Sequence, residues 1–260
     1  MTLALLYKIA VPPILVALMT LAARRWGPTV GGLIMGLPWM TGPVLFVLTL
    51  DKGVEFAIAA CTGIELAVIS LAGFILIFGL SSGFAPWPVA LASGIGTYFG
   101  IGILVQGLDV PLWVASTAGA VALVSAAFLL PKPKAAVFPG HLPWWDIPAR
   151  VVATFALVAV ILLTADQLGP RLSGIVATYP VILTVVGTFT LQQWGRDAFL
   201  RVLRGLSLSL LAFVGFFLVV GTMLEDYGLV VSFIVATIVA VGISAALIGW
   251  NNWRLSRIAQ

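Results

Sequence analysis

Apolar residues run through this sequence in long blocks that short polar breaks separate. A helix needs about 20 residues to cross the hydrocarbon core of a bilayer, and each block has roughly that length. The breaks carry charges and turn residues, for example Arg24-Arg25 and Asp51-Lys52. The pattern predicts an all-α polytopic membrane protein with about nine transmembrane helices, at residues 3–23, 26–50, 54–80, 84–106, 110–130, 147–166, 168–192, 197–222 and 227–250.

Two of these blocks, 26–50 and 168–192, contain a proline near the centre, Pro38 and Pro180. A proline inside a helix removes a backbone donor and clashes with the preceding turn, so we expect both helices to kink or split. A rival interpretation makes both blocks re-entrant hairpins and leaves seven spans. Each half-block holds about 12 residues, too few to cross a bilayer, whereas the whole block suits one crossing. We therefore favour nine spans.

The two proline-containing blocks belong to a longer internal repeat with an offset of 142 residues. Seven of the nine glycines in 169–242 fall on glycines of 27–100 at this offset, without a gap. The matches in the broken blocks are Gly27, Pro28, Gly32 and Pro38 with Gly169, Pro170, Gly174 and Pro180. This self-similarity indicates a duplication, and the shared glycines favour close helix packing or bending.

Counting spans gives the orientation of the two copies. Spans one to four correspond to spans six to nine, and the fifth span is a linker. Because equivalent helices are five spans apart, an odd number, the second copy must run opposite to the first. The sequence thus predicts a 4+1+4 inverted repeat, with the two broken helices opposed at the membrane midplane. The expected divisions are 1–107 for the first repeat, 108–146 for the linker span and a cytoplasmic loop, and 147–260 for the second repeat.

Composition and charge agree with a membrane location. The chain is 62% hydrophobic and 8% charged, which excludes a soluble domain. With nine spans, ten of the 13 Lys and Arg residues fall on one side, which should be cytoplasmic. We therefore expect a multi-pass protein of the bacterial inner membrane, with its N-terminus outside and its C-terminus in the cytoplasm. The net charge of +4 comes from few residues and does not indicate nucleic-acid binding.

Several kinds of chemistry have no pattern in the sequence. A single cysteine, Cys61, excludes a disulfide framework and a cysteine metal cluster. No phosphate-binding G-x-x-x-x-G-K motif and no Ser–His arrangement occurs. We expect a protein that is not an enzyme and uses no cofactor or metal.

Glu65 is the one carboxylate well inside a predicted span, and its repeat mate is Ser207. A charged group at that depth is costly, so Glu65 should be protonated, paired, or in a wet cavity. One interpretation makes it a proton carrier or a ligand for a coupling cation or cationic substrate. The other makes it a neutral acid that hydrogen-bonds to a neighbouring helix and takes no part in transport.

The helix breaks themselves are candidate binding positions. If Pro38 and Pro180 open the helices, the second halves begin with unpaired amides, which favour an anionic group. The first halves end in free carbonyls around 34–37 and 176–179, which favour a cation. A plain kink that only shapes the packing is the alternative for each helix alone. The side chains nearest the breaks are Trp39, Met40, Thr41, Thr178, Tyr179 and Thr184.

Two arginines, Arg201 and Arg204, share a face of the eighth predicted span near its cytoplasmic start. They are expected to extend toward the lipid headgroups, with gating or attraction of an anionic solute as the alternative. Small residues in the fifth span form a predicted packing face, and a second copy of the chain is one candidate partner.

The two broken helices resemble those of a known class of membrane protein. The residues on which this resemblance depends are Gly27-Pro28, Gly32 and Pro38 with their repeat mates. The plan resembles that of the bile acid–sodium symporter and cation–proton antiporter superfamilies, in architecture only. Its 4+1+4 pattern departs from their five-plus-five plan, and the adjacent-aspartate pair of the antiporters is missing. The resemblance implies a secondary active transporter for a small organic solute, working by alternating access and coupled to protons or a monovalent cation.

Two other functions stay open at this point. A lipid flippase, or an enzyme acting on lipid-linked intermediates, would show a groove open to the bilayer, with Arg201 and Arg204 at its mouth. A non-transporting accessory subunit would show a filled midplane and an exposed patch for a partner.

Overall fold

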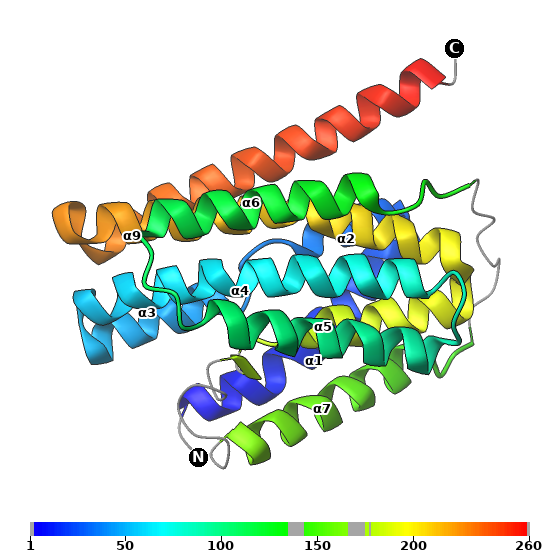
Figure 1. The fold of residues 1–260 in the computed structure, drawn as a ribbon, viewed down its shortest axis with the longest axis horizontal. Coiled ribbons are helices and arrows are strands. Elements are labelled where there is room, and N and C mark those ends of the chain that lie inside the picture. The colour runs from blue at the N-terminus through cyan, green and yellow to red at the C-terminus, as the bar shows by residue number, and fades with distance from the viewer. Residues whose placement is uncertain (1–2, 135–142, 166–174, 177, 259–260) are drawn as a thin grey trace.

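A computed structural model describes residues 3–134, 143–165, 175–176 and 178–258 (Figure 1). These residues form helices and contain no strand, so the predicted helical class is confirmed. The helices are α1 (Leu3–Trp26), α2 (Pro28–Met35), α3 (Thr41–Lys52), α4 (Val54–Ser81), α5 (Trp87–Val105), α6 (Leu112–Leu129), α7 (Asp146–Ala165) and α9 (Val181–Ile258).

Four helical segments of the described residues are long and apolar enough to cross a membrane. They are Val54–Ser81, Trp87–Val105, Leu112–Leu129 and Val181–Gly249. Large apolar side chains also lie on the outside of the molecule, among them Phe84, Leu104 and Phe128. A soluble surface rarely exposes so many large apolar side chains together, whereas a lipid-facing surface requires them. The apolar helices therefore indicate a membrane protein.

The long element α9 is interrupted twice by glycines in a non-helical conformation. Gly195 has φ 81° and ψ 175°, and Gly228 has φ 75° and ψ 174°. The helical stretches of α9 are consequently 181–194, 196–227 and 229–258, and Figure 1 shows the ribbon reversing between them. Gly53, the repeat mate of Gly195, joins α3 to α4 with φ 89° and ψ 175°. A duplicated glycine thus makes the same turn twice, in a region of backbone space that side chains rarely enter.

Replacing Gly53 or Gly195 by alanine should lower stability by about 1–3 kcal/mol each, because alanine is strained at this φ and ψ. Gly63→Ala is the matched control. Gly63 lies inside helix α4 and an added Cβ would meet no atom within 4 Å, so alanine there should be neutral or slightly stabilising. Thermal unfolding of the purified variants measures the difference. Equal melting temperatures for the Gly53 and Gly63 variants would contradict a required positive φ.

Two pairs of helices contact each other end to start. Arg24, near the end of α1, forms an ion pair with Asp146 at the start of α7. Arg196, at the start of the stretch 196–227, donates a hydrogen bond to Ser82, which directly follows α4. Each contact joins the end of one helix to the start of the other, so the two helices of each of these pairs are antiparallel.

The stretch 196–227 also crosses α2 at very short range. A Cβ added at Gly32 would lie 2.4 Å from the Val202 carbonyl oxygen, and one added at Gly205 would lie 2.6 Å from the Thr29 carbonyl oxygen. The Ser209 hydroxyl donates to the Gly32 carbonyl at 3.1 Å. Glycines in both helices therefore allow backbone contact, as the sequence predicted for close packing.

The main core lies where α4, α5 and α9 meet and is rich in aromatic side chains. Phe74, Phe78, Tyr98 and Phe199 are completely buried there. Phe78 and Phe199 pack edge to face with ring centroids 4.6 Å apart. This core packs against the segment around Pro180, and it thus fixes the location of one of the two candidate binding sites.

Candidate functional site

The first predicted break is present at Pro38. Helix α2 ends at Met35 and α3 begins at Thr41. Between them, the Leu37 amide donates to the Ile34 carbonyl at 3.4 Å, and the Trp39 amide donates to the Leu37 carbonyl at 2.8 Å. The Gly42 amide then donates to the Pro38 carbonyl at 3.1 Å, which restarts the helix.

The second break, at Pro180, makes the same three backbone hydrogen bonds at the offset of 142. The Tyr179 amide donates to the Val176 carbonyl at 3.2 Å, and the Val181 amide donates to the Tyr179 carbonyl at 2.8 Å. The Thr184 amide donates to the Pro180 carbonyl at 2.9 Å. Two chain segments far apart in sequence therefore adopt one backbone geometry.

These hydrogen bonds overturn the prediction of free backbone groups at the breaks. The Trp39 and Val181 amides, which were expected to be unpaired, are donors within their own segments. The Ile34 carbonyl accepts the Trp39 indole N–H at 2.9 Å besides its backbone partner. The Leu37 and Tyr179 carbonyls accept these two amides, so the backbone groups next to each proline are already used within the segment.

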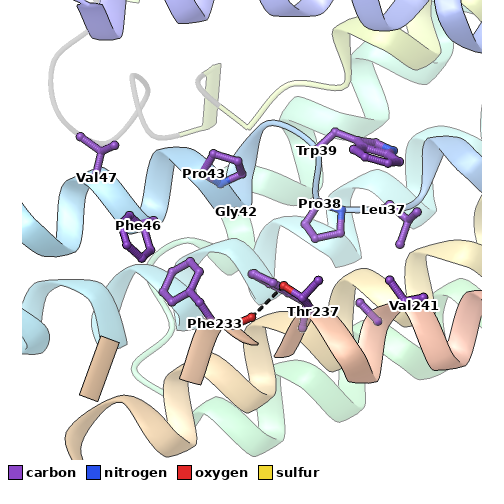
Figure 2. Close-up of a pocket in the computed structure, with 12 residues that line it drawn as sticks. Leu37, Pro38, Trp39, Gly42, Pro43, Phe46, Val47, Phe233, Thr237 and Val241 are labelled. Atoms are coloured by element: carbon purple, nitrogen blue, oxygen red, sulfur yellow. Dashed lines mark hydrogen bonds between the residues drawn. The ribbon is translucent and has the colours of Figure 1, made fainter. Parts of the chain in front are cut away.

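The first break opens onto a cavity of about 490 Å³ between α3 and the stretch 229–258 (Figure 2). Pro38 and Phe46 lie on one side of it and Phe233 and Thr237 on the other. The Phe46 and Phe233 rings meet edge to face with centroids 5.1 Å apart. The lining residues carry no charge; they are Leu37, Pro38, Trp39, Gly42, Pro43, Phe46, Val47, Phe216, Phe233, Thr237, Ala240 and Val241.

The second break is closed by aromatic side chains. The Tyr98 hydroxyl from α5 lies 3.1 Å from the Ile175 carbonyl oxygen, to which it donates, and 2.9 Å from the Thr178 hydroxyl. The Tyr179 ring packs edge to face on Tyr98 at 5.5 Å and stacks on Phe99 at 6.0 Å. The Thr184 hydroxyl lies 2.8 Å from the Tyr179 hydroxyl. Aromatic rings and paired hydroxyls therefore fill the space next to Pro180.

Side-chain size differs between the two breaks at several pairs of positions related by the offset of 142. Beside Pro180 four residues are larger than their equivalents beside Pro38: Tyr98 corresponds to Ala240, Phe99 to Val241, Tyr179 to Leu37 and Thr184 to Gly42. The reverse holds at three pairs, since Trp39, Phe46 and Phe233 are larger than Val181, Thr188 and Leu91. By this correspondence the cavity lies next to Ala240, the equivalent of the Tyr98 ring at the other break.

Glu65 lies apart from this cavity, completely buried on α4. Neither of its carboxyl oxygens has a hydrogen-bond partner among the described residues. The Ser116 hydroxyl of α6 faces the carboxyl without meeting hydrogen-bond geometry. Gly119 lets α6 approach closely, because a Cβ there would lie 3.3 Å from the Glu65 carbonyl oxygen. The predicted mate, Ser207, instead donates to its own helix at Leu203.

Four other predicted site residues lie outside the cavity lining. Met40 and Thr41 form the start of α3 and are half-buried. Arg201 donates to the Lys134 carbonyl, and Arg204 donates to the Leu130 carbonyl at the end of α6. Arginine side chains stabilise helix C-termini in this way, because they pair with carbonyls that lack a partner. The structure thus places the Arg204 guanidinium at the α6 terminus and the Arg201 guanidinium at the segment that follows α6, and neither residue lines the cavity.

Sequence reasoning missed a buried charge cluster between α1 and α7. Asp146 is 0% exposed and pairs with Arg24 and with Arg150, which is 1% exposed. The Arg150 guanidinium also lies 5.0 Å from the centre of the Phe189 ring. The spacing of Asp146 and Arg150, four residues apart on one helix, is the signal that could have revealed the pair.

The sequence analysis also did not identify the residues opposite Pro38, which are Phe233 and Thr237, because they belong to the last stretch of α9.

Within the part of the chain that the structure describes, no group of three or more His, Cys, Asp or Glu side chains could hold a metal ion. The chain has no significant match among protein-family models, curated proteins or solved structures.

Proposed function

We propose that this protein is a secondary transporter that moves a small organic solute across the bacterial inner membrane by alternating access. The observation that carries the proposal is the pair of breaks, which share one backbone geometry while one is open and the other closed. In inverted-repeat transporters one repeat moves against the other around a midplane site, so that the solute never meets both sides of the membrane at once, and paired broken helices typically form that site.

An inverted 4+1+4 repeat of about nine spans is part of this proposal. Three observations support it: the hydrogen bonds shared by the breaks, the matching turns at Gly53 and Gly195, and the antiparallel helix mates. The proposed orientation keeps the N-terminus outside and the C-terminus in the cytoplasm, as the Lys and Arg distribution favours.

Labelling at equivalent helix ends tests this architecture. Asp51, at the end of α3, and Gln192, just before Gly195, are exposed. The turn at Gly53 precedes α4, whereas Arg196 contacts Gly83 beyond the other end of α4. We expect Asp51→Cys and Gln192→Cys, each in a Cys61→Ala background, to react with an impermeant maleimide from opposite sides of the membrane. Reaction from the same side would overturn the inverted repeat.

Glu65 is the proposed coupling residue, and its surroundings favour a proton over a metal cation. A carboxylate buried without a counter-charge is very unfavourable, so this state holds the neutral acid. A cation such as Na⁺ would need several oxygen ligands, and among the described residues the Ser116 hydroxyl is the side-chain oxygen that faces the carboxyl. Release of the proton in the opposite state would link solute movement to the proton gradient.

One observation favours a lipid-handling protein as the second candidate. A further hollow of about 350 Å³ adjoins the cavity, and the apolar residues Val230, Ile234 and Ile238 of its lining are exposed. Such a groove could hold an acyl chain. Reconstitution in liposomes separates the two candidates, because a transporter produces solute flux and a flippase moves fluorescent phospholipid between leaflets. Phospholipid movement without solute flux would replace the transporter proposal with the second candidate.

A further inference from the structure

The cavity at the first break lacks any charged group. Its lining has no acidic or basic side chain. Its polar donors are already used, since the Thr237 hydroxyl donates to the Phe233 carbonyl at 2.7 Å and the Trp39 indole donates to the Ile34 carbonyl at 2.9 Å. An anion that entered would lose its water without gaining a partner, and a cation would gain only the aromatic faces, which replace a small part of its hydration. The cavity therefore selects against charged molecules.

The lining does offer one acceptor and several aromatic faces. The Thr237 oxygen has spare lone pairs after it has donated its proton, so it can accept from an O–H or N–H group. Phe46, Phe216 and Phe233 form a connected set of edge-to-face rings, with centroids 5.1 Å and 5.7 Å apart. Such rings favour a further aromatic partner.

The equivalent position at the second break shows what fits beside such a proline. There the Tyr98 side chain, an uncharged phenol, packs against Tyr179 and hydrogen-bonds to Ile175 and Thr178. The residue equivalent to Tyr98 at the first break is Ala240, which lines the cavity. The protein thus places a phenol ring of its own at one of two equivalent positions and only a methyl group at the other.

We infer that the cavity at Pro38 is a binding site for an uncharged molecule that carries a phenol-like ring, which packs on Phe46 and Phe233 while its donor group reaches Thr237. Such a molecule would be the solute of the proposed transporter. Only this role of the site, and not the binding of the molecule, rests on the proposed function. Binding itself can be tested without transport.

Fluorine NMR of protein labelled with 5-fluorotryptophan reports on this site, because Trp39 lines the cavity. The Trp39→Phe variant assigns the signal. We expect p-cresol to shift the Trp39 signal saturably, and benzoate and benzylammonium to leave it unchanged. A larger shift with either ion at the same concentration would overturn the inference. A signal that responds to the acyl-chain length of the detergent and not to p-cresol would also overturn it, because a lipid chain would then occupy the cavity.

Two variants make the assignment specific. Ala240→Tyr should abolish the p-cresol shift because its ring fills the cavity, whereas Val231→Tyr, on the same helical stretch but outside the lining, should not. Thr237→Val removes the acceptor at an exposed position and should weaken p-cresol binding about fivefold while toluene binding stays the same. Unchanged p-cresol affinity in Thr237→Val would contradict the proposed orientation. Saturable binding of p-cresol without any transport would support the binding site and contradict the proposed transport function.

Discussion

Replacing Glu65 by glutamine is expected to abolish proton-driven solute current while leaving the fold intact. Glutamine has the shape of the neutral acid but cannot release a proton, so solute movement loses its link to the gradient. The side chain takes part in no ion pair of the described residues, so the free energy of unfolding should change by less than about 1 kcal/mol. The symport of one proton with an uncharged solute moves net charge, and proteoliposomes on a solid-supported membrane would record it as a current.

The matched control is Glu55→Gln, an exposed carboxyl on the same helix, which should keep the full current. Solute exchange at equal pH should persist in Glu65→Gln, because binding at the Pro38 cavity does not involve this residue. A normal pH-dependent current in Glu65→Gln would remove Glu65 from the mechanism. Loss of exchange as well would assign it a structural role.

Replacing Tyr98 by alanine should destabilise the protein by about 3–5 kcal/mol, because it deletes a completely buried ring and leaves a cavity. Addition of p-cresol should then raise the melting temperature of Tyr98→Ala more than that of the unchanged protein. The added molecule restores both the ring contacts and a donor for the Ile175 carbonyl, and binding to the folded state stabilises it.

Tyr98→Phe is the control for this rescue. It keeps the ring and loses the hydroxyl that bonds to Ile175, so it should cost about 1–2 kcal/mol and gain nothing extra from p-cresol. Thermal unfolding of the three proteins with and without p-cresol gives the comparison. Equal stabilisation of all three would show that the space around Pro180 is not the counterpart of the cavity around Pro38.

The resemblance to secondary transporters stays a prediction, whereas the helix breaks on which it depends can be compared with the structure. Pro38 was predicted to break its helix, and α2 ends at Met35 while α3 begins at Thr41. After Pro180 a helix begins at Val181, and most of the predicted first half, 168–179, lies outside the described residues. The prediction of free carbonyls was wrong for Ile34 and Leu37, because the chain between Ile34 and Trp39 folds back on itself and uses those two groups. Local hydrogen bonding of this kind depends on the dihedral angles of a few residues, which a proline alone does not determine.

The sequence by itself determined the helical class and the positions of the two prolines that interrupt it. Proline acts through its own backbone, so its effect is the same wherever the helix packs. Glycine only permits a turn, since Gly53 has a positive φ whereas Gly63 lies inside α4. Only the tertiary structure decided that the space beside Pro38 is empty and the one beside Pro180 is full. The side chains responsible, Ala240 and Tyr98, lie on helices distant in sequence from the breaks. Burial of Glu65 without a partner was likewise decided by packing, because it depends on which face of α6 meets α4.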